Sequence, residues 1–275
     1  MSRTRPQVPF PAQAGPPLLR GYVAAVLVFV FAPIAASLVF SFNSDRYPTL
    51  PLGGFTLGWY RELAADPLVW EGFRNTAVVA LLSAGLSTVI GFAAAYTDHR
   101  FRFFGKPAYL ALALLPPTVP ATIMGLAMLA YLSRIGLSGA LHAVVLSHVV
   151  LCAPFAMAIV RLRLSQMDPS LESAAWNLGA GPWRALALVV LPFTAPAVLA
   201  AFFITMAVSF DEFAVAWFVG GLEETLPVRV LSSLQGQVSP RINAIGTIVF
   251  AVSIALVVVA QAALRLRRPQ PENPS

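Results

Sequence analysis

The chain has 275 residues, of which 58% are hydrophobic and 11% charged, and its mean hydropathy is positive. So small a polar fraction cannot cover a water-soluble globule of this length, which indicates that most of the chain lies in lipid. The net charge of +6 raises the question of nucleic acid, but the basic residues flank long apolar runs instead of clustering with aromatics, so we expect no nucleic-acid partner.

The chain begins with a basic segment, residues 1–19, which we expect to form a cytoplasmic tail before the first apolar stretch. Together they superficially resemble a secretory signal. However, 21–42 comprises 22 residues without a charge, too many for the apolar region of a signal and enough to cross a bilayer. The sequence therefore predicts an uncleaved first helix.

Six apolar stretches without Asp, Glu, Lys or Arg reach the roughly 20 helical residues that a bilayer core requires. They are continuous rather than alternating, which favours helices, because helices satisfy their own backbone groups in lipid. Prolines inside several of them, among them Pro116, Pro117 and Pro120, favour kinks. The sequence thus predicts an all-α membrane protein with six transmembrane helices in one domain, 20–268. The predicted spans lie near 21–42, 76–97, 107–133, 135–160, 185–210 and 242–264.

Lys and Arg in the loops give the orientation. With a cytoplasmic N-terminus, twelve of these residues fall on the cytoplasmic side and six on the opposite side. Both termini are therefore predicted to be cytoplasmic, and the tail 269–275 is predicted to be disordered. The long outer segment from Asn43 to Asn75 carries several aromatic residues, which suits an interfacial belt or, alternatively, a docking surface.

The sequence carries none of the motifs expected of a site for ATP, a metal or catalysis. The single lysine, Lys106, lacks both the following Ser or Thr and the upstream glycine of a P-loop. His142 and His148 lie six residues apart, unlike the paired ligands of a helical metal site, and no known hydrolase motif occurs. We expect no enzyme activity, metal or other cofactor in this chain, and any ATP and Mg²⁺ would be bound by a separate subunit.

The predicted cytoplasmic segment 161–184 contains a short helix of about three turns. Asp168 and Pro169 suit its N-cap and first position, and Gly179 closes it. Its apolar residues recur at three- and four-residue spacing and form a stripe that either docks on a partner or lies on the bilayer interface. The stripe consists of Leu171, Ala174, Ala175 and Leu178.

This segment resembles the inner-membrane component of ABC importers, whose signature is Glu-Ala-Ala, three residues, Gly, nine residues and Ile-x-Leu-Pro. Measured from Gly179, Ser173 stands in the Glu position, and the nearest carboxylate, Glu172, lies about 100° round the helix. The resemblance implies a coupling helix that docks into an ATPase. Because Ser173 replaces the Glu of the signature, the charge contact that this Glu implies is not expected, whereas the docking itself is. Its expected coupling residues are Glu172, Ser173, Ala174, Ala175, Gly179, Leu191 and Pro192.

The resemblance covers nearly the whole chain and is closest to the spermidine/putrescine permeases. It is carried, in order, by SFNSDRY, the Trp59-Tyr60 pair, FRFFGKP, SFDEF, LPVRV and VSPRINAIGTI. It implies a type I importer fold with several passes through the bacterial inner membrane, paired with a second permease as a heterodimer. It also implies two ATPase subunits and an extracytoplasmic binding protein as partners.

The implied substrate is a polyamine or a related small organic cation. Ala121 departs from this pattern, because it stands where the polyamine permeases carry an acidic residue. Two alternatives stay open: a permease for a different small solute, such as an amino-acid-like compound, iron or another ion, and a stand-alone secondary transporter.

Asp211 and Glu212 are the only acidic pair with apolar sequence on both sides. Carboxylates at membrane depth usually face a cavity or a partner. Counting from Pro192 at 1.5 Å per residue places them roughly 29 Å along the fifth span, near its outer end. Our hypothesis is that they line the substrate pathway, with Trp59, and attract a cation. The alternative is that they mark the end of the span or pair with an arginine of the partner permease.

Overall fold

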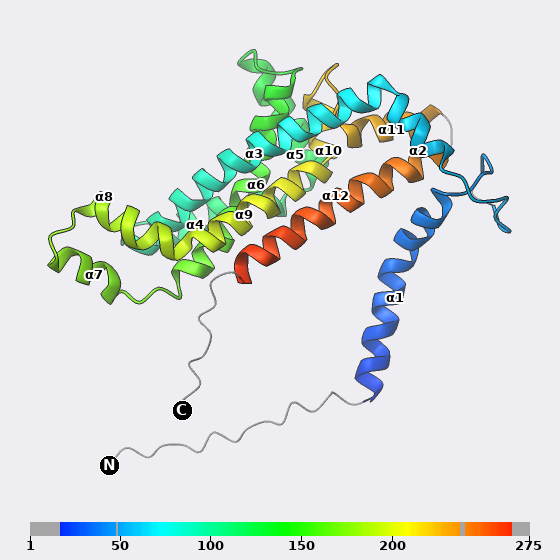
Figure 1. Ribbon diagram of the computed structural model, residues 1–275. Coiled ribbons are helices and arrows are strands. Elements are labelled where there is room, and N and C mark those ends of the chain that lie inside the picture. Colours follow the sequence, from blue (N-terminus) through cyan, green and yellow to red (C-terminus); the bar gives the residue numbers. More distant parts are fainter. Residues whose placement is uncertain (1–16, 48, 237–239, 266–275) are drawn as a thin grey trace.

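The computed structural model describes residues 17–47, 49–236 and 240–265, and within these ranges the chain forms an elongated bundle of helices (Figure 1). Residues 1–16 of the predicted N-terminal tail and the predicted C-terminal tail at 269–275 lie outside the described residues. The predicted all-helical architecture is confirmed in its general form, since the described part contains helices and a single isolated β-bridge between Asn43 and Phe55.

Five helical stretches in the described ranges are long and apolar enough to cross a membrane. One of them, Pro182–Asp211, is composite, because a short helix and a π-helical turn lead directly into α9. The stretches are α1 (Pro17–Phe40), α3 (Pro67–Arg100), α6 (Leu141–Leu164), α8 (Pro182–Ala185) with η2 (Leu186–Val190) and α9 (Leu191–Asp211), and α12 (Pro240–Arg265).

The predicted third span, 107–133, is wrong as a single helix. It is split into α4 (Lys106–Leu114), the 3₁₀ turn η1 (Pro116–Thr118) and α5 (Ala121–Arg134). Proline lacks a backbone N–H and disfavours the helical conformation at the residue before it, and Val119, before Pro120, is extended, with φ −82° and ψ 131°. The three prolines within five positions therefore break the helix where a kink was expected. Both halves are shorter than a bilayer requires, so the described ranges hold five long spanning helices where the sequence predicted six spans.

The predicted fourth span, 135–160, begins later than expected. Gly136 and Gly139 have φ angles of 72° and 85°, in the left-handed region that favours glycine, and they form the turn between α5 and α6. Helix α6 therefore starts at Leu141 and continues to Leu164.

Helices α3, α6 and α9 pack against one another in the centre of the bundle, and α12 packs on α9. Helices α3 and α6 approach closely at Gly91, because this residue has no side chain to hold their backbones apart. A Cβ added to Gly91 would meet the Ala156 Cβ and the Met157 backbone N at 2.6 Å. Small residues at helix contacts are typical of membrane bundles, where close backbone approach drives association.

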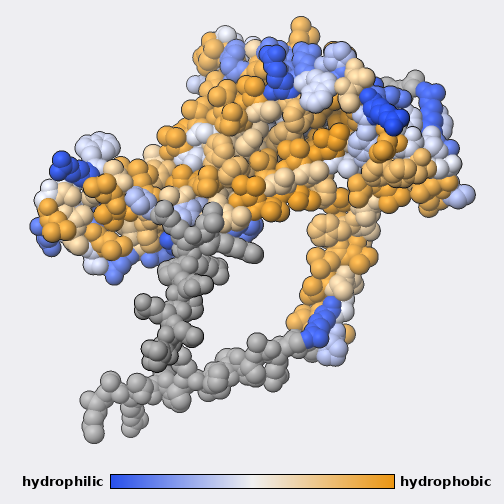
Figure 2. Space-filling model, viewed as in Figure 1, coloured by the Kyte–Doolittle hydropathy of each residue, from blue (hydrophilic) through white to orange (hydrophobic). Residues whose placement is uncertain are grey.

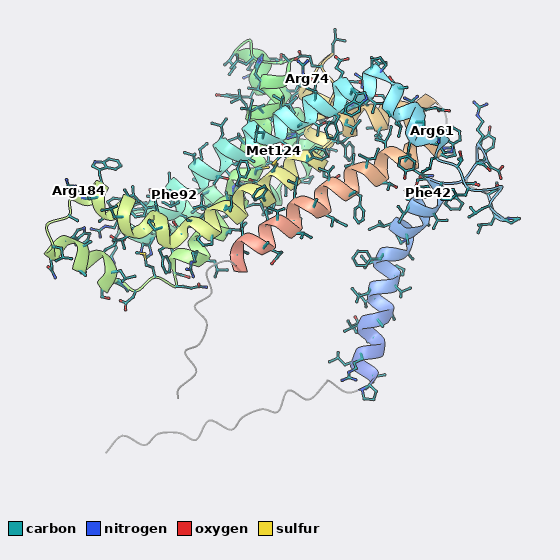
Figure 3. All side chains as sticks on the ribbon, in the orientation of Figure 1. Phe42, Arg61, Arg74, Phe92, Met124 and Arg184 are labelled. Atoms are coloured by element: carbon teal, nitrogen blue, oxygen red, sulfur yellow. The ribbon has the colours of Figure 1, made fainter. Side chains whose placement is uncertain are left out.

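Helix α1 leaves the bundle and makes its contacts with α12 (Figure 1). None of its residues is buried. The surface of the long helices is predominantly apolar in the view of Figure 2, and polar residues gather toward the ends. Figure 3 places Arg184 at one end and Arg61 and Arg74 toward the other, with Phe92 and Met124 between them.

The short helices mark the two ends of the bundle. At one end lies α7 (Ser170–Asn177), beside α8. At the opposite end lie α2 (Gly58–Ala65) and α11 (Leu226–Gly236), and α10 (Ala214–Val219) follows α9 on that side and packs on α5 and α6. We call these the α7 end and the α2 end.

Candidate functional site

Helix α7 forms where the sequence predicts a short helix, but it has eight residues, about two turns rather than three. Asp168 Oδ1 accepts a hydrogen bond from the Ser170 backbone N at 2.9 Å, which stabilises the first turn and lowers the pKa of the Asp168 carboxyl. Gly179 ends the helix with a φ of 82°, in the left-handed conformation expected for a helix C-terminus.

One side of α7 is open to the surroundings. Leu171, Ala174 and Leu178 are exposed, Leu178 by 89% of its surface, while Ala175 is half-buried. Leu171, Ala174 and Leu178 form an apolar strip on α7, of the kind that a partner protein covers. Trp183, at the start of α8, is also exposed, by 81% of its surface.

Ser173 does not replace the charge of the carboxylate that the signature has at its position. Its side chain is exposed, and Oγ donates to the Pro169 carbonyl at 3.2 Å. Glu172 points in a different direction. It is only 6% exposed, and its Oε2 lies 3.5 Å from Nε of Arg100, the last residue of α3. The structure therefore places Glu172 against the bundle, apart from the exposed residues with which the signature groups it.

Arg100 belongs to a charged cluster that the sequence analysis missed. Two residues earlier, buried Asp98 pairs with Arg161 at 2.6 Å and with Lys106 at 3.1 Å. The cluster thus joins the ends of α3 and α6 to the start of α4 and to α7. We call Asp98, Arg100, Lys106, Arg161 and Glu172 the α3-end cluster. An acid immediately after an apolar span, followed by basic loop residues, was the available signal for it.

Leu191 and Pro192, the last part of the signature, open α9 directly after the π-helical turn η2. Pro192 has no N–H to donate to the preceding turn, so a locally widened helix is the expected arrangement there. Helix α7 packs against both α8 and η2. The two parts of the signature are thus linked through one short connection at the α7 end.

Asp211 and Glu212 lie at the other end of α9 and make different contacts. Glu212 Oε1 accepts a hydrogen bond from the Val215 N at 2.9 Å, so it caps α10. Asp211 is exposed and lines a cavity of about 580 Å³ between α1, α11 and α12, whose other walls are largely apolar. The two neighbouring carboxylates therefore lie in different surroundings.

Trp59 lines a different cavity, of about 780 Å³, at the α2 end. Its indole N–H donates to the Asn43 carbonyl at 2.7 Å, which fixes the ring. The pathway hypothesis expected Trp59 and Asp211 to line the same cavity, but the structure places them in two different cavities. The cavity beside Trp59 is lined by opposite charges in equal number, namely Glu62, Asp66 and Glu224 with Arg46, Arg229 and Arg241.

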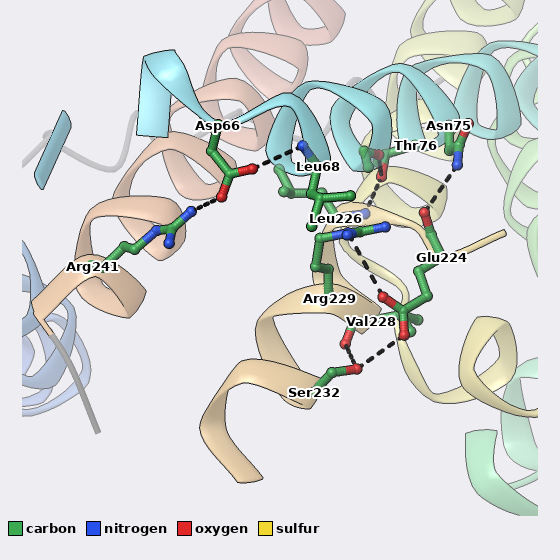
Figure 4. Close-up of polar contacts among 11 residues, drawn as sticks. Asp66, Leu68, Asn75, Thr76, Glu224, Leu226, Val228, Arg229, Ser232 and Arg241 are labelled. Carbon is green, nitrogen blue, oxygen red and sulfur yellow. Dashed lines mark hydrogen bonds and ion pairs between the residues drawn. The ribbon is translucent and has the colours of Figure 1, made fainter. Parts of the chain in front are cut away.

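Most of these charges are tied to the helices around them, as Figure 4 shows. Asp66 pairs with Arg241 and also accepts a hydrogen bond from the Leu68 N at 2.8 Å, capping α3. Burial raises the pKa of Asp66, but Arg241 and the backbone donors outweigh it, so the pKa lies below its ordinary value.

The loop before α11 is held on α3 by two polar contacts (Figure 4). Asn75 Nδ2 donates to the Glu224 carbonyl at 3.1 Å, and the Leu226 N donates to Thr76 Oγ1 at 2.7 Å. Glu224 in turn lies 3.7 Å from Arg229. Helix α3 therefore binds the segment before α11 near its N-terminal end, and the α3-end cluster lies at its C-terminal end.

Comparison with known protein families gives one matching model. Residues 87–269 match the family described as binding-protein-dependent transport system inner membrane component. The match includes α7, the whole signature, Asp211 and Glu212.

Relatives of known function extend the similarity over most of the chain. The spermidine/putrescine transport system permease protein PotC of Haemophilus influenzae is 31% identical over 245 residues, which cover 89% of this chain and 95% of that protein. The putrescine transport system permease protein PotI of Escherichia coli is 31% identical over 231 residues, 80% of this chain and 81% of that protein.

Solved structures share the fold. A bacterial ABC transporter involved in the import of the acidic polysaccharide alginate has a TM-score of 0.71 over 91% of this chain and 95% of its own. The sequence identity is 16%, so this similarity concerns the fold alone.

Proposed function

Because the chain belongs to the family of binding-protein-dependent transport inner membrane components, we propose that it forms half of a translocation pathway for polyamines or related organic cations. The family makes it a multi-pass permease subunit of the bacterial inner membrane. It is a transport subunit and not an enzyme, and the ATPase is a separate subunit. The observation that carries the substrate proposal is the 31% identity to a spermidine/putrescine permease over 89% of the chain.

The other half of the pathway would be a second permease, and two features of the helices support this. Helix α1 is apolar from Gly21 onward except for Ser37, and none of its residues is buried (Figures 1 and 2). A groove of about 540 Å³ between α3 and α9 contains small residues, including Gly85 and Ala195, that would let another helix approach closely. Thr88 Oγ1 is buried in this groove without a hydrogen bond within the described residues, which a partner helix would correct.

Two ATPase subunits would dock at the α7 end of the pair, one on each permease. The exposed strip of Leu171, Ala174 and Leu178 supplies the apolar contact that such docking requires. The extracytoplasmic binding protein would approach the α2 end, with both termini of the chain in the cytoplasm.

Asp211 is the residue that best supports a cationic substrate. It is exposed, it lines a mostly apolar cavity, and an ammonium entering such a place needs a carboxylate to offset its desolvation. Glu212, occupied in capping α10, contributes less to this proposal.

A permease for a different small solute is the second candidate. The cavity beside Trp59 carries as many arginines as acids, which does not favour cations over zwitterions or anions. Ala121 adds to this, because it places no carboxylate at the start of α5.

The test uses the chain purified in mild detergent with its native neighbours and reconstituted in proteoliposomes. We expect a second permease and an ATPase to copurify, and ATP-driven uptake of labelled spermidine when the loaded binding protein is added. Copurification without a response to spermidine or putrescine would favour a different solute. Uptake by this chain reconstituted alone would overturn the proposal.

A further inference from the structure

We propose that Arg100 is a positioning residue that ties α7 to α3 through Glu172 and Trp176, so that a displacement of α7 is passed directly to α3. This inference rests on the proposed function, in which an ATPase docks on α7. It concerns the step after docking, namely which transmembrane helix receives the motion and through which side chains.

The ion pair is the first contact that carries the inference. The Glu172 carboxylate is buried, with Oε2 3.5 Å from the Arg100 guanidinium. Its Oε1 accepts no hydrogen bond from any residue that the structure describes. A buried carboxylate without a counter-charge is unfavourable, so Glu172 can stay buried against the bundle only while Arg100 lies beside it, and the pair favours a fixed position of α7 relative to the end of α3.

The second contact uses the same guanidinium. Arg100 lies over the ring of Trp176, 4.5 Å from its centroid. Because Glu172 and Trp176 are four residues apart on a helix, they share one face of α7, and Arg100 engages both. Two different interactions thus converge on one side chain at the last position of α3.

Helix α7 consequently has two separate faces. Glu172 and Trp176 face Arg100, although Trp176 keeps 38% of its surface exposed, whereas Leu171, Ala174 and Leu178 form the exposed strip on another side of the helix. The chain carries Ser173 where the signature has Glu, and this serine is exposed and uncharged. The negative charge of α7 is therefore directed at the chain's own α3 and not at the docking side.

The end of α3 is suited to pass a motion onward. Asp98, two residues before Arg100, pairs with Arg161 at the end of α6 and with Lys106 at the start of α4. Helix α3 continues for 34 residues, about 50 Å, to the α2 end, where Asn75 and Thr76 hold the segment before α11. A shift of α3 would thus reach both ends of the bundle, as alternating access requires.

The experiment measures coupling in the reconstituted importer, with its ATPase and binding protein, as substrate transported per ATP hydrolysed. Arg100→Gln and Glu172→Gln are compared with Arg102→Gln. Arg102 is exposed, two residues beyond Arg100, and makes no ion pair in the described part of the chain. We expect the first two variants to retain the ATPase on purification but to lower the transport-to-hydrolysis ratio about tenfold, with Arg102→Gln unchanged.

Rescue separates positioning from a general loss of structure. The exchanged pair, Arg100→Glu with Glu172→Arg, restores the opposite charges, and we expect it to recover a substantial part of the ratio lost in each single reversal. An exchanged pair no better than the poorer single reversal would overturn the inference.

If Arg100→Gln fails to retain the ATPase, Trp176→Leu provides the second variant, since it removes the stacking and keeps the ion pair. We expect it to lower the ratio about fivefold. Ratios equal to wild type in the assembled Gln and Leu variants would overturn the inference while leaving the proposed function intact. A wild-type complex that shows no ATP-driven uptake would overturn the proposed function and the inference with it.

Discussion

At the scale of single residues, the role of each carboxylate follows from the groups that face it. Asp66 faces Arg241 and two backbone donors at the start of α3, and its pKa is lowered because these outweigh the effect of burial. Asp66 is thus held as the anion in the folded chain. Its contribution to stability is fully present above the unfolded pKa, about 3.9, and is lost as the pH falls through the lower folded value.

Asp66→Asn tests this assignment. The amide oxygen still accepts from the Leu68 N, so the cap is retained, but the attraction to Arg241 is lost. Because both side chains are partly exposed, we expect a loss of about 1 kcal/mol at neutral pH. Thermal unfolding in detergent should show this loss at pH 7 and a smaller one near pH 3. Glu62→Gln, an exposed acid on the same cavity, serves as the control. Equal losses at both pH values would contradict the assignment.

Asp211 and Glu212 are neighbours whose substitutions should differ in effect. Asp211→Lys places a positive charge on the cavity of about 580 Å³, and we expect uptake of spermidine to fall by at least about tenfold with the complex still assembled. Glu212→Gln retains an oxygen that can accept from the Val215 N, so uptake should change little. Uptake in proteoliposomes with matched protein amounts measures both. Unchanged uptake in Asp211→Lys would remove this residue from the pathway.

At the scale of elements, apolar length predicted every long helix, because each long apolar stretch must cross the membrane or be buried. The third stretch was misjudged since hydropathy counts side chains and not backbone donors, and Pro116, Pro117 and Pro120 remove the donors that a continuous helix requires. Helix α7 was located from Asp168 and Gly179, whose local conformations do not depend on the rest of the fold. The division of α7 into a face that contacts Arg100 and a face that is exposed was not predictable, because it depends on where the fold places Arg100.

The close contact between α3 and α6 depends on the absence of a side chain at Gly91. A side chain at Gly91 would collide with the backbone N of Met157, which cannot rotate away. We expect Gly91→Val to separate the two helices and to lower the free energy of unfolding by about 1–3 kcal/mol. For Gly85→Ala, six residues earlier on α3, the added Cβ meets no described atom of a neighbouring element within 4 Å, and alanine favours the helix, so the midpoint of thermal unfolding should not fall. A stable Gly91→Val variant would show that α3 and α6 adjust freely.

At the scale of the whole molecule, α3 connects two groups of charges that belong to opposite ends of the bundle. The pairs Asp98–Arg161 and Asp66–Arg241 join residues far apart in the sequence, and their formation depends on how the helices are arranged. Sequence reasoning therefore identified the exposed strip of α7 and the signature but found neither charge cluster. It also expected one outer pathway where the structure has separate cavities for Trp59 and Asp211.

The groove between α3 and α9 decides whether the chain pairs with a second permease through this face. Gly85 lines the groove beside Thr88, whose hydroxyl has no hydrogen-bond partner among the described residues. Within the same part of the chain, no atom of another element lies within 4 Å of a Cβ placed at Gly85. Gly85→Leu should therefore leave this subunit folded but fill the space that a partner helix would occupy. We expect the second permease to be lost on purification. Ile90→Phe, an enlargement of an exposed residue about 140° round α3 from Gly85 and outside the lining of the groove, should retain it. Retention of the partner by Gly85→Leu would place the subunit interface elsewhere, with α1 as the next surface to test.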